Sequence, residues 1–330
     1  MKKFLAIFLL LAMLVSMTAC GATQSNGVLP TNPPAGGNND NNNENKETEG
    51  KPSKSDAVVA VEKLIEAIGE VSENSLDDIT TAEEAYKALS SSEKAQVENA
   101  AVLTAARDAY DQLVVAKEAA EVIAKIDAIG TVSSSKLDQV LEVVRLYNSC
   151  SKNVQKAVTN YDVLKDAATT LANKMLSKMD CDEDFVRNIN FYYPEAFPWG
   201  EDGYWYADEG CFVLPYMGVS GNQVWLRLVC NYNSWDWIFF EKITYAVDSE
   251  RYYDYFNYFD VVRDNSGGEI WEYVDMEVGA SEIEMLWAIA NSNKTVIRFE
   301  GDDYYDDYTV TSKQKQSIRD MLIVYELLNL

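Results

Sequence analysis

Apolar residues between positions 56 and 178 recur at the spacing of amphipathic helices. The first set lies on one helical face and comprises Val58, Val61, Leu64, Ile65 and Ile68. Gly69 follows this set, where a helix commonly ends. The same pattern predicts a helix over residues 76–89, a short helical turn over 92–97, and a long helix over 101–129. Because one stripe of each helix must be buried, these apolar positions are predicted core residues.

The helical pattern returns after 61 residues. Ile65-Glu66-Ala67-Ile68-Gly69 recurs as Ile126-Asp127-Ala128-Ile129-Gly130, and the register holds without a gap through Tyr86 and Tyr147. We therefore predict two three-helix modules, residues 56–116 and 117–178, that form an all-α repeat rod. No Pro or Gly interrupts residues 101–129, which predicts one unbroken helix across the junction near 114–118, shared by both modules.

From residue 180 to 330 the pattern changes to short apolar and aromatic runs between turn residues, which is typical of strands. The predicted strands are Cys211–Met217, Val224–Tyr232, Trp237–Val247, Arg251–Tyr258, Ile270–Glu277, Thr295–Glu300 and Tyr305–Val310. Two helices follow capping boxes, Ser281 with Glu284 and Thr311 with Gln314. These elements predict an α+β head domain, rich in antiparallel strands, with two packed sheets and helices at their edge.

The N-terminus has the pattern of an export signal. Lys2 and Lys3 precede an apolar run, 4–15, that is too short for an ordinary membrane span, and Met17-Thr18-Ala19-Cys20 closes it. This stretch resembles the lipobox of bacterial lipoproteins of the Gram-positive type. The resemblance implies removal of residues 1–19, diacylation of Cys20, and anchoring by that lipid on the outer face of the cytoplasmic membrane. Residues 20–55 are rich in Asn, Pro and charged residues, which predicts a disordered tether.

Short motifs connect both folded regions to known families. The Ala67-Ile68-Gly69 start, the Ala85-Tyr86 pair and the Val-x-Asn-x-x-x-Leu end at 97–103 resemble the three-helix modules of Gram-positive surface proteins. That resemblance implies a spacer or a binding module. Three segments of the head resemble C-terminal parts of uncharacterised Gram-positive lipoproteins: Trp225-Leu226-Arg227, Phe239-Phe240-Glu241-Lys242 and Ile297-Arg298-Phe299-Glu300-Gly301.

Charge and composition exclude several classes of function. The formal net charge is −25, which argues against nucleic acid as a partner, since binding it requires Lys and Arg to neutralise phosphates. The chain contains no histidine, which removes Ser-His-Asp and Cys-His catalysis and every His-ligated metal site. No motif marks a catalytic residue, and we expect no cofactor.

Four cysteines remain after Cys20: Cys150, Cys181, Cys211 and Cys230. An even number in an exported protein permits disulfides. A turn over 218–223 would place Cys211 opposite Cys230 in a hairpin, close to disulfide reach. Two small thiols in a buried core are an equal alternative.

Two kinds of side-chain cluster suggest ligands in the head. Asp302, Asp303, Asp306 and Asp307 could supply oxygen ligands to calcium, although their spacing is not that of an EF-hand and a solvated turn explains them as well. All seven Trp lie in the head, and Trp205, Trp235 and Trp237 stand next to further aromatic or acidic residues. Exposed aromatic rings can stack on a ligand, but packing within a sheet uses the same residues. Trp235 is the first candidate because residues 231–236 are predicted to form a loop.

We therefore expect a lipid-anchored cell-surface protein that presents a binding head on a helical spacer, with an envelope glycan or a protein as ligand. The alternative is a carboxylate-dependent hydrolase of cell-wall glycans, because the head holds many acids that could act in pairs. A purely structural role in the envelope is a third hypothesis.

Overall fold

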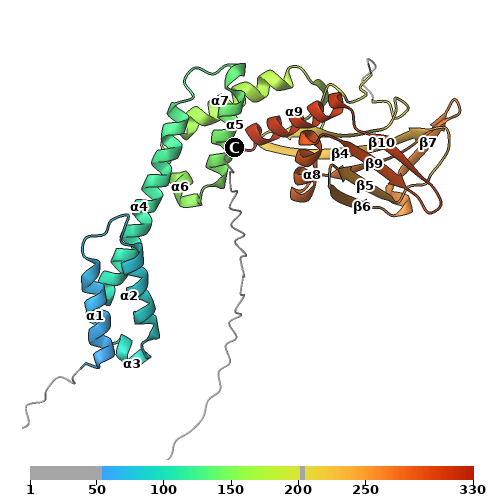
Figure 1. The fold of residues 1–330 in the computed structure, drawn as a ribbon. Coiled ribbons are helices and arrows are strands. Elements are labelled where there is room, and N and C mark those ends of the chain that lie inside the picture. Colours follow the sequence, from blue (N-terminus) through green and yellow to red (C-terminus); the bar gives the residue numbers. More distant parts are fainter. Residues whose placement is uncertain (1–53, 201–204) are drawn as a thin grey trace, which may run out of the picture. The chain divides into compact units, whose positions relative to one another are not determined.

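We describe the protein from a computed structural model, which covers residues 54–200 and 205–330. The predicted signal peptide, the predicted lipidation site Cys20 and nearly all of the predicted tether lie outside these residues. A helical region is followed by an α+β domain with antiparallel sheets, as the sequence predicts (Figure 1). No helix within the described ranges has both the length and the apolar character needed to cross a membrane.

The helical region consists of seven α-helices and one 3₁₀ turn within the described residues. They are α1 (Asp56–Ile68), α2 (Leu76–Ala88), α3 (Ser91–Lys94), α4 (Ala100–Asp127), η1 (Ser134–Lys136), α5 (Leu137–Ser149), α6 (Lys152–Ala157) and α7 (Tyr161–Leu176). Ser55 caps α1 by accepting a hydrogen bond from the Val58 N–H, and Gly69 follows the helix with φ +59°. That backbone conformation favours glycine, as the sequence pattern implies.

The helix α4 is unbroken from Ala100 to Asp127, which confirms the prediction of one helix across the junction. Its first half packs Leu103 and Ala106 into a core with α1 and α2. Its second half packs Val122 and Ile126 into another core, which also holds α5 and α7. We call α1–α3 with the first half of α4 the first helical group, and the rest of α4 with η1 and α5–α7 the second helical group.

The 61-residue offset reappears in specific hydrogen bonds. Asn99 Nδ2 donates to the carbonyl of Glu62 at 2.9 Å, and Asn160 Nδ2 donates to the carbonyl of Ile123 at 3.1 Å. Gly130 has φ +63°, close to the value at its counterpart Gly69. At these two pairs of positions, equivalent residues therefore perform the same structural role in both groups.

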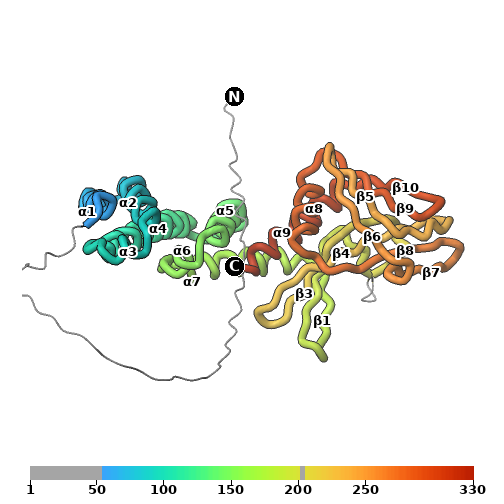
Figure 2. Tube along the Cα trace, turned by 90° about the horizontal axis from the view of Figure 1, so that it is seen from below, coloured from blue at the N-terminus to red at the C-terminus, as the bar shows by residue number. Residues whose placement is uncertain are grey.

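The head contains two antiparallel sheets (Figures 1 and 2). The six-stranded sheet has the order β1 (Asp180–Asp184), β2 (Ile189–Tyr193), β3 (Phe212–Ser220), β4 (Gln223–Ser234), β8 (Glu269–Glu277) and β7 (Val262–Ser266). The four-stranded sheet has the order β10 (Tyr305–Thr309), β9 (Thr295–Glu300), β5 (Lys242–Val247) and β6 (Glu250–Tyr255). The remaining elements are η2 (Tyr258–Asp260), α8 (Ala280–Asn291) and α9 (Ser312–Leu328).

Alternating residues of the strands form the core of the head. Ile243 and Tyr245 of β5 are fully buried, whereas Lys242 and Thr244 between them are partly exposed. One continuous core includes both sheets, α8, α9 and the second helical group. The head and the second helical group are therefore joined by shared packing.

Several predicted boundaries differ from the structure. The strand predicted from Trp237 begins at Lys242, because residues 237–241 form a loop. The Ser281–Glu284 capping box is wrong: α8 begins after Gly279, whose N–H donates to the Glu282 carboxylate at 2.7 Å. The box at Thr311 and Gln314 is confirmed by both of its hydrogen bonds.

The predicted register of the β3–β4 hairpin is wrong by two residues. Ser220 pairs with Gln223, so Gly221 and Asn222 form the turn, and Val213 rather than Cys211 lies opposite Cys230. Cys211 and Cys230 are free thiols. Cys211 Sγ contacts the backbone of Asn233, while Cys230 is buried with its Sγ 3.3 Å from the Tyr245 hydroxyl. The hairpin therefore does not present these two cysteines to each other as a facing pair.

Candidate functional site

The three tryptophans singled out in the sequence lie in two different environments. Trp235 and Trp237 lie on the loop between β4 and β5, and Trp235 is 69 % exposed. Trp237 is partly buried, and its ring stacks on Phe239 with 5.6 Å between the ring centres. Trp205 is also partly buried, but its edge-to-face contacts are with Phe197, Phe212 and Tyr273. Trp205 therefore belongs to the packing of the six-stranded sheet, and we do not retain it as a ligand-binding residue.

A second aromatic segment lies close to Phe239 of the first loop. Tyr258 and Phe259 of η2 are 49 % and 93 % exposed, and Phe239 on the first loop is 45 % exposed. The two loops meet at Arg263, whose guanidinium lies 4.3 Å from the centre of the Tyr258 ring and 5.7 Å from that of Phe239. We call these five residues the aromatic tip: Trp235, Trp237, Phe239, Tyr258 and Phe259.

A buried ion pair holds both loops of the aromatic tip. Glu272 of β8 is fully buried, and its carboxylate accepts hydrogen bonds from the N–H groups of Ile238, Phe239 and Phe240 at 2.8–3.0 Å. Arg263 Nε donates to the same carboxylate at 3.1 Å. A buried charge is tolerated only when it is paired and hydrogen-bonded. The carboxylate therefore depends on these N–H groups, and its hydrogen bonds hold the backbone of residues 238–240 in place.

Arg263 connects the ion pair to the second loop. Its guanidinium donates to the carbonyl oxygens of Tyr258 at 2.6 Å and of Phe240 at 3.1 Å. Asp260 closes η2 by accepting hydrogen bonds from the backbone and side chain of Asn257, both at 2.9 Å. The two loops are therefore positioned by one network of charged groups and backbone.

The backbone at Phe239 is strained. Its φ of +53° lies in the left-handed region, which costs a residue with a side chain about 1–3 kcal/mol. Close packing beside it also requires glycine, because a Cβ at Gly301 would overlap the carbonyl oxygen of Ile238. A Cβ added at Gly268 would lie 3.8 Å from the Trp235 ring, so the β7–β8 turn passes near that ring. Strain of this kind persists only where the surroundings enforce it, and it is common at functional sites.

Exposed acids adjoin residues of the aromatic tip and Arg263 along the chain. Asp236 follows Trp235, Asp260 follows Phe259, and Asp264 follows Arg263, and all three are exposed. Since the Arg263 side chain is only 10 % exposed and already paired, the charge that faces solvent here is negative. The candidate site therefore combines exposed aromatic rings with a negatively charged surrounding surface.

The four aspartates proposed as a calcium site do not converge. Asp307 forms a two-point ion pair with Arg298 at 2.7 and 2.8 Å, and Asp306 accepts a hydrogen bond from the Asp307 N–H. The Arg298 guanidinium holds the pKa of Asp307 below its usual value. Across residues 54–200 and 205–330, no three acidic or cysteine side chains gather in a way that could hold a metal ion. The calcium hypothesis is therefore not retained.

Sequence reasoning missed Glu272 and Arg263, although the strand pattern contains a signal for the first. Ile270 and Val274 point into the core, so Glu272 between them must also point inward. A lone acid on the inward face of an alternating strand needs a buried cation or several N–H donors. Its partner is nine residues away, and no local pattern marks it.

No protein-family model, curated protein or solved structure matches this chain. The proposals below therefore rest on the residues and their geometry.

Proposed function

We propose that this chain is a lipid-anchored cell-surface protein whose head binds a polypeptide ligand through the aromatic tip. The observation that carries the proposal is the set of exposed rings held in place by the buried Glu272–Arg263 pair. Exposed apolar patches on soluble domains mark interaction sites, and Trp and Tyr are enriched among the residues that dominate binding energy.

Pre-organisation strengthens this interpretation. A loop that must be ordered on binding loses affinity, because ordering it costs conformational entropy. Here Glu272 and Arg263 order both loops before any ligand arrives, and the Phe239 ring is 45 % exposed on that ordered backbone. This order in the absence of a ligand is expected of a binding surface, because little entropy would be lost when a ligand binds.

Charge indicates the chemistry of the partner. The head from residue 181 onward contains 28 Asp and Glu against 10 Lys and Arg, and the rim of the aromatic tip is acidic. An anionic membrane surface or an anionic wall polymer would be repelled. The ligand that fits is a polypeptide with an apolar centre flanked by Lys or Arg.

The anchor and the spacer complete the proposal. Cys20 is diacylated, residues 21–55 form the tether, and the two helical groups act as three-helix modules joined through α4 in a stiff spacer. Two acyl chains give stable membrane attachment where one would be marginal. Replacing Cys20 with Ser should release the protein from the membrane fraction or leave it unprocessed, and normal cleavage with unchanged partitioning would contradict the anchor.

Site-specific crosslinking tests the binding site. A photo-reactive amino acid at Phe259 should crosslink the displayed protein to one polypeptide of the cell envelope, and Trp235→Ala should weaken that capture about 30-fold. Phe185 is the matched control, because it is 86 % exposed on the separate β1–β2 hairpin. Equal crosslinking from both positions, or capture unaffected by Trp235→Ala, would contradict the proposal.

A neutral glycan is a second candidate ligand, favoured by a different face of the head. On the outer face of the four-stranded sheet, Tyr253, Tyr255 and Tyr305 are 51–73 % exposed around paired charges. Lys242 lies over the rings of Tyr253 and Tyr255, and Arg298 lies 4.1 Å from that of Tyr305. Sugar rings stack on such faces while charged groups bond their hydroxyls. Glycan binding lost in Tyr255→Ala but kept in Trp235→Ala would favour this candidate.

The glycan hydrolase remains an alternative hypothesis. Burial raises the pKa of Asp254, as a general acid requires, but its carboxylate accepts a hydrogen bond from the buried Tyr245 hydroxyl at 2.7 Å. That geometry suits a structural carboxyl. Cleavage of a wall glycan by the protein, abolished by changing one carboxylate, would favour the enzyme.

A further inference from the structure

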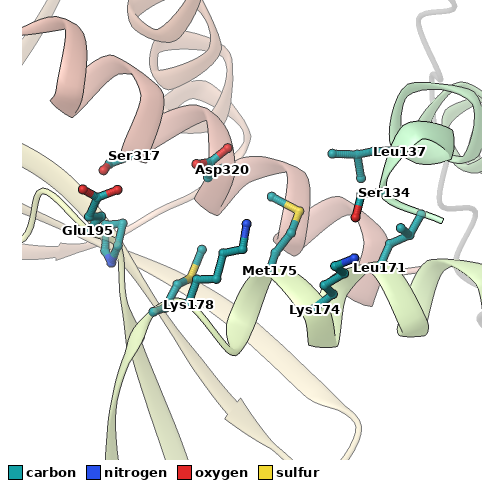
Figure 3. A pocket seen from close by; sticks show the side chains of 11 residues that line it. Ser134, Leu137, Leu171, Lys174, Met175, Lys178, Glu195, Ser317 and Asp320 are labelled. Atoms are coloured by element: carbon teal, nitrogen blue, oxygen red, sulfur yellow. The ribbon is translucent and has the colours of Figure 1, made fainter.

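A hollow of about 300 Å³ lies between the second helical group and the head. Figure 3 shows α7 on one side of it and α9 on the other. One continuous core joins these two elements, and Arg145 of α5 also bonds Glu326 of α9 at 2.6 Å. The hollow is therefore part of a packed junction between two parts of the fold, a position where small-molecule sites commonly occur.

The two walls of the hollow carry opposite charges. Lys174 lies in the last turn of α7 and Lys178 in the turn that follows the helix, and no described residue forms an ion pair with either. Asp320 of α9 and Glu195, after β2, form the facing wall (Figure 3). Glu195 is bridged by the exposed Lys313 at 3.5 Å, and Asp320 accepts a hydrogen bond from Gln316 at 2.9 Å. Both carboxylates can accept further bonds, since each has two oxygens.

The floor between the charged walls is apolar. It consists of Leu137, Leu171, Met175, Met179 and Pro194. Met side chains adapt to the shape of what they contact, so a floor of this kind accommodates aliphatic groups of different shape. Ser317 adds one nearly buried hydroxyl, whose oxygen accepts the Ala196 N–H at 3.0 Å and whose hydrogen can be donated to a ligand.

We propose that this junction hollow binds a small zwitterion with an apolar body, namely a free apolar α-amino acid. The ammonium groups of Lys174 and Lys178 receive its carboxylate, Asp320 and Glu195 receive its ammonium group, and the side chain lies on the methionine and leucine floor. A ligand with only one charge would leave one wall unpaired. The proposal is independent of the aromatic tip, because it concerns a different part of the molecule.

Matched ligands test the recognition of both charges. Calorimetry with the protein from residue 21 to 330 should detect binding of L-leucine. N-acetyl-L-leucine lacks the ammonium group and L-leucinamide lacks the carboxylate, so each should bind about tenfold more weakly. Equal affinity for all three compounds would overturn the proposal, and so would failure of L-leucine, L-methionine and L-phenylalanine to bind with a Kd below about 1 mM.

Matched variants test which wall binds which group. The double variant Lys174→Gln, Lys178→Gln should weaken L-leucine about tenfold and leave L-leucinamide unchanged, whereas Asp320→Asn should weaken L-leucinamide and leave N-acetyl-L-leucine unchanged. Lys165→Gln, an exposed position on the opposite side of α7, is the control and should have no effect. Because the changed side chains are exposed or half-buried, all variants should fold, which circular dichroism verifies. L-leucine binding that none of these variants changes would place the ligand elsewhere and overturn the assignment.

Discussion

Arg145 on α5 and Glu326 on α9 form a two-point ion pair, at 2.6 and 3.1 Å, that links the second helical group to the head. Trp287 of α8 takes part twice: its indole N–H donates to Glu326 at 3.0 Å, and its ring lies 4.9 Å from the Arg145 guanidinium. One carboxylate thus connects three helices. Removing the Glu326 carboxylate would leave the exposed Arg145 side chain in contact with solvent, but it would leave the half-buried Trp287 N–H without its acceptor.

We predict an asymmetric response at this link. Arg145→Ala should cost about 1 kcal/mol or less, because Arg145 is half exposed and surface ion pairs contribute little. Glu326→Ala should cost more, about 1–3 kcal/mol, since it also leaves the half-buried Trp287 N–H without an acceptor. Urea unfolding of both variants and of the double variant measures the difference, and equal costs would contradict the role assigned to Trp287.

The stability of the fold should be sensitive to a conservative change in the buried Glu272–Arg263 ion pair. Glu272→Gln removes the charge that compensates Arg263 and replaces one acceptor oxygen by a donor facing backbone N–H groups. We expect a loss of about 3–5 kcal/mol in the free energy of unfolding. Asp264→Asn, at an exposed position on the neighbouring strand, is the control and should change stability by less than about 0.5 kcal/mol.

The network also predicts a local effect. In a Glu272→Gln variant that still folds, amide exchange should accelerate first at residues 238–240, whose N–H groups lose their acceptor. Uniform acceleration across the head, without preference for this loop, would show that the carboxylate serves general stability instead of ordering the tip.

Helix α4 should transmit stability between the two helical groups. Ala116→Pro breaks the helix at an exposed position between the two cores and should cost about 3 kcal/mol, whereas Ala116→Gly should cost about 1 kcal/mol. In the proline variant, the first helical group should unfold at a lower urea concentration than the rest of the chain. Residues 56–100 contain no tryptophan, so a fluorescent label attached there would report this transition. A single coincident transition in the proline variant would contradict the separation of the cores.

Acid should weaken the first helical group through Glu83. The Arg107 hydrogen bonds hold the pKa of Glu83 below its ordinary value of 4.5. The folded state therefore binds the proton less readily than the unfolded state, and the stabilisation is complete above pH 4.5 and is lost as the pH falls through the lowered pKa. Relative to Glu83→Gln, the protein should gain about 0.5–1 kcal/mol at pH 7, since the carboxylate is partly solvated, and this gain should disappear once the pH has fallen below the lowered pKa of Glu83.

The exposed neighbour Glu84 provides the control for this titration. Glu84→Gln should lower stability by less than Glu83→Gln at pH 7, because no described residue forms an ion pair with it. Identical pH profiles for the two variants would show that the Arg107 pair does not stabilise the fold.

The helical region was predictable because its pattern is local. Nine of the ten core positions of the first helical group have a buried equivalent 61 residues later, the exception being Leu89, whose equivalent Cys150 is half-buried. No Gly or Pro interrupts α4. The register of the β3–β4 hairpin was not predictable, because both Gly218 and Gly221 are suitable turn residues. Gly218 lies within β3, where the ring of Trp225 packs on its backbone in the space a Cβ would occupy, whereas Gly221 has the positive φ of a tight turn.

The candidate site was predictable only in part. The loop position of Trp235 follows from its sequence neighbours, and its exposure agrees with that expectation. The contribution of Phe259 could not be seen, because it depends on Arg263 drawing η2 against the other loop. The junction hollow depends on residues from α7 and α9 that are more than a hundred positions apart. Contacts of that range are set by how elements pack, and no periodicity along the chain encodes them.

The separate core of the first helical group gives the chain a mechanical order. A pull applied between residue 54 and the head loads two bodies in series: one held by a small core of its own, the other by a core that extends from Ala119 to Leu327. We expect the small core to yield first and to release its helices as extended chain, while the head and the junction stay folded. The first helical group would then limit the force on the head, because it would unfold and lengthen under tension and refold when the tension is removed.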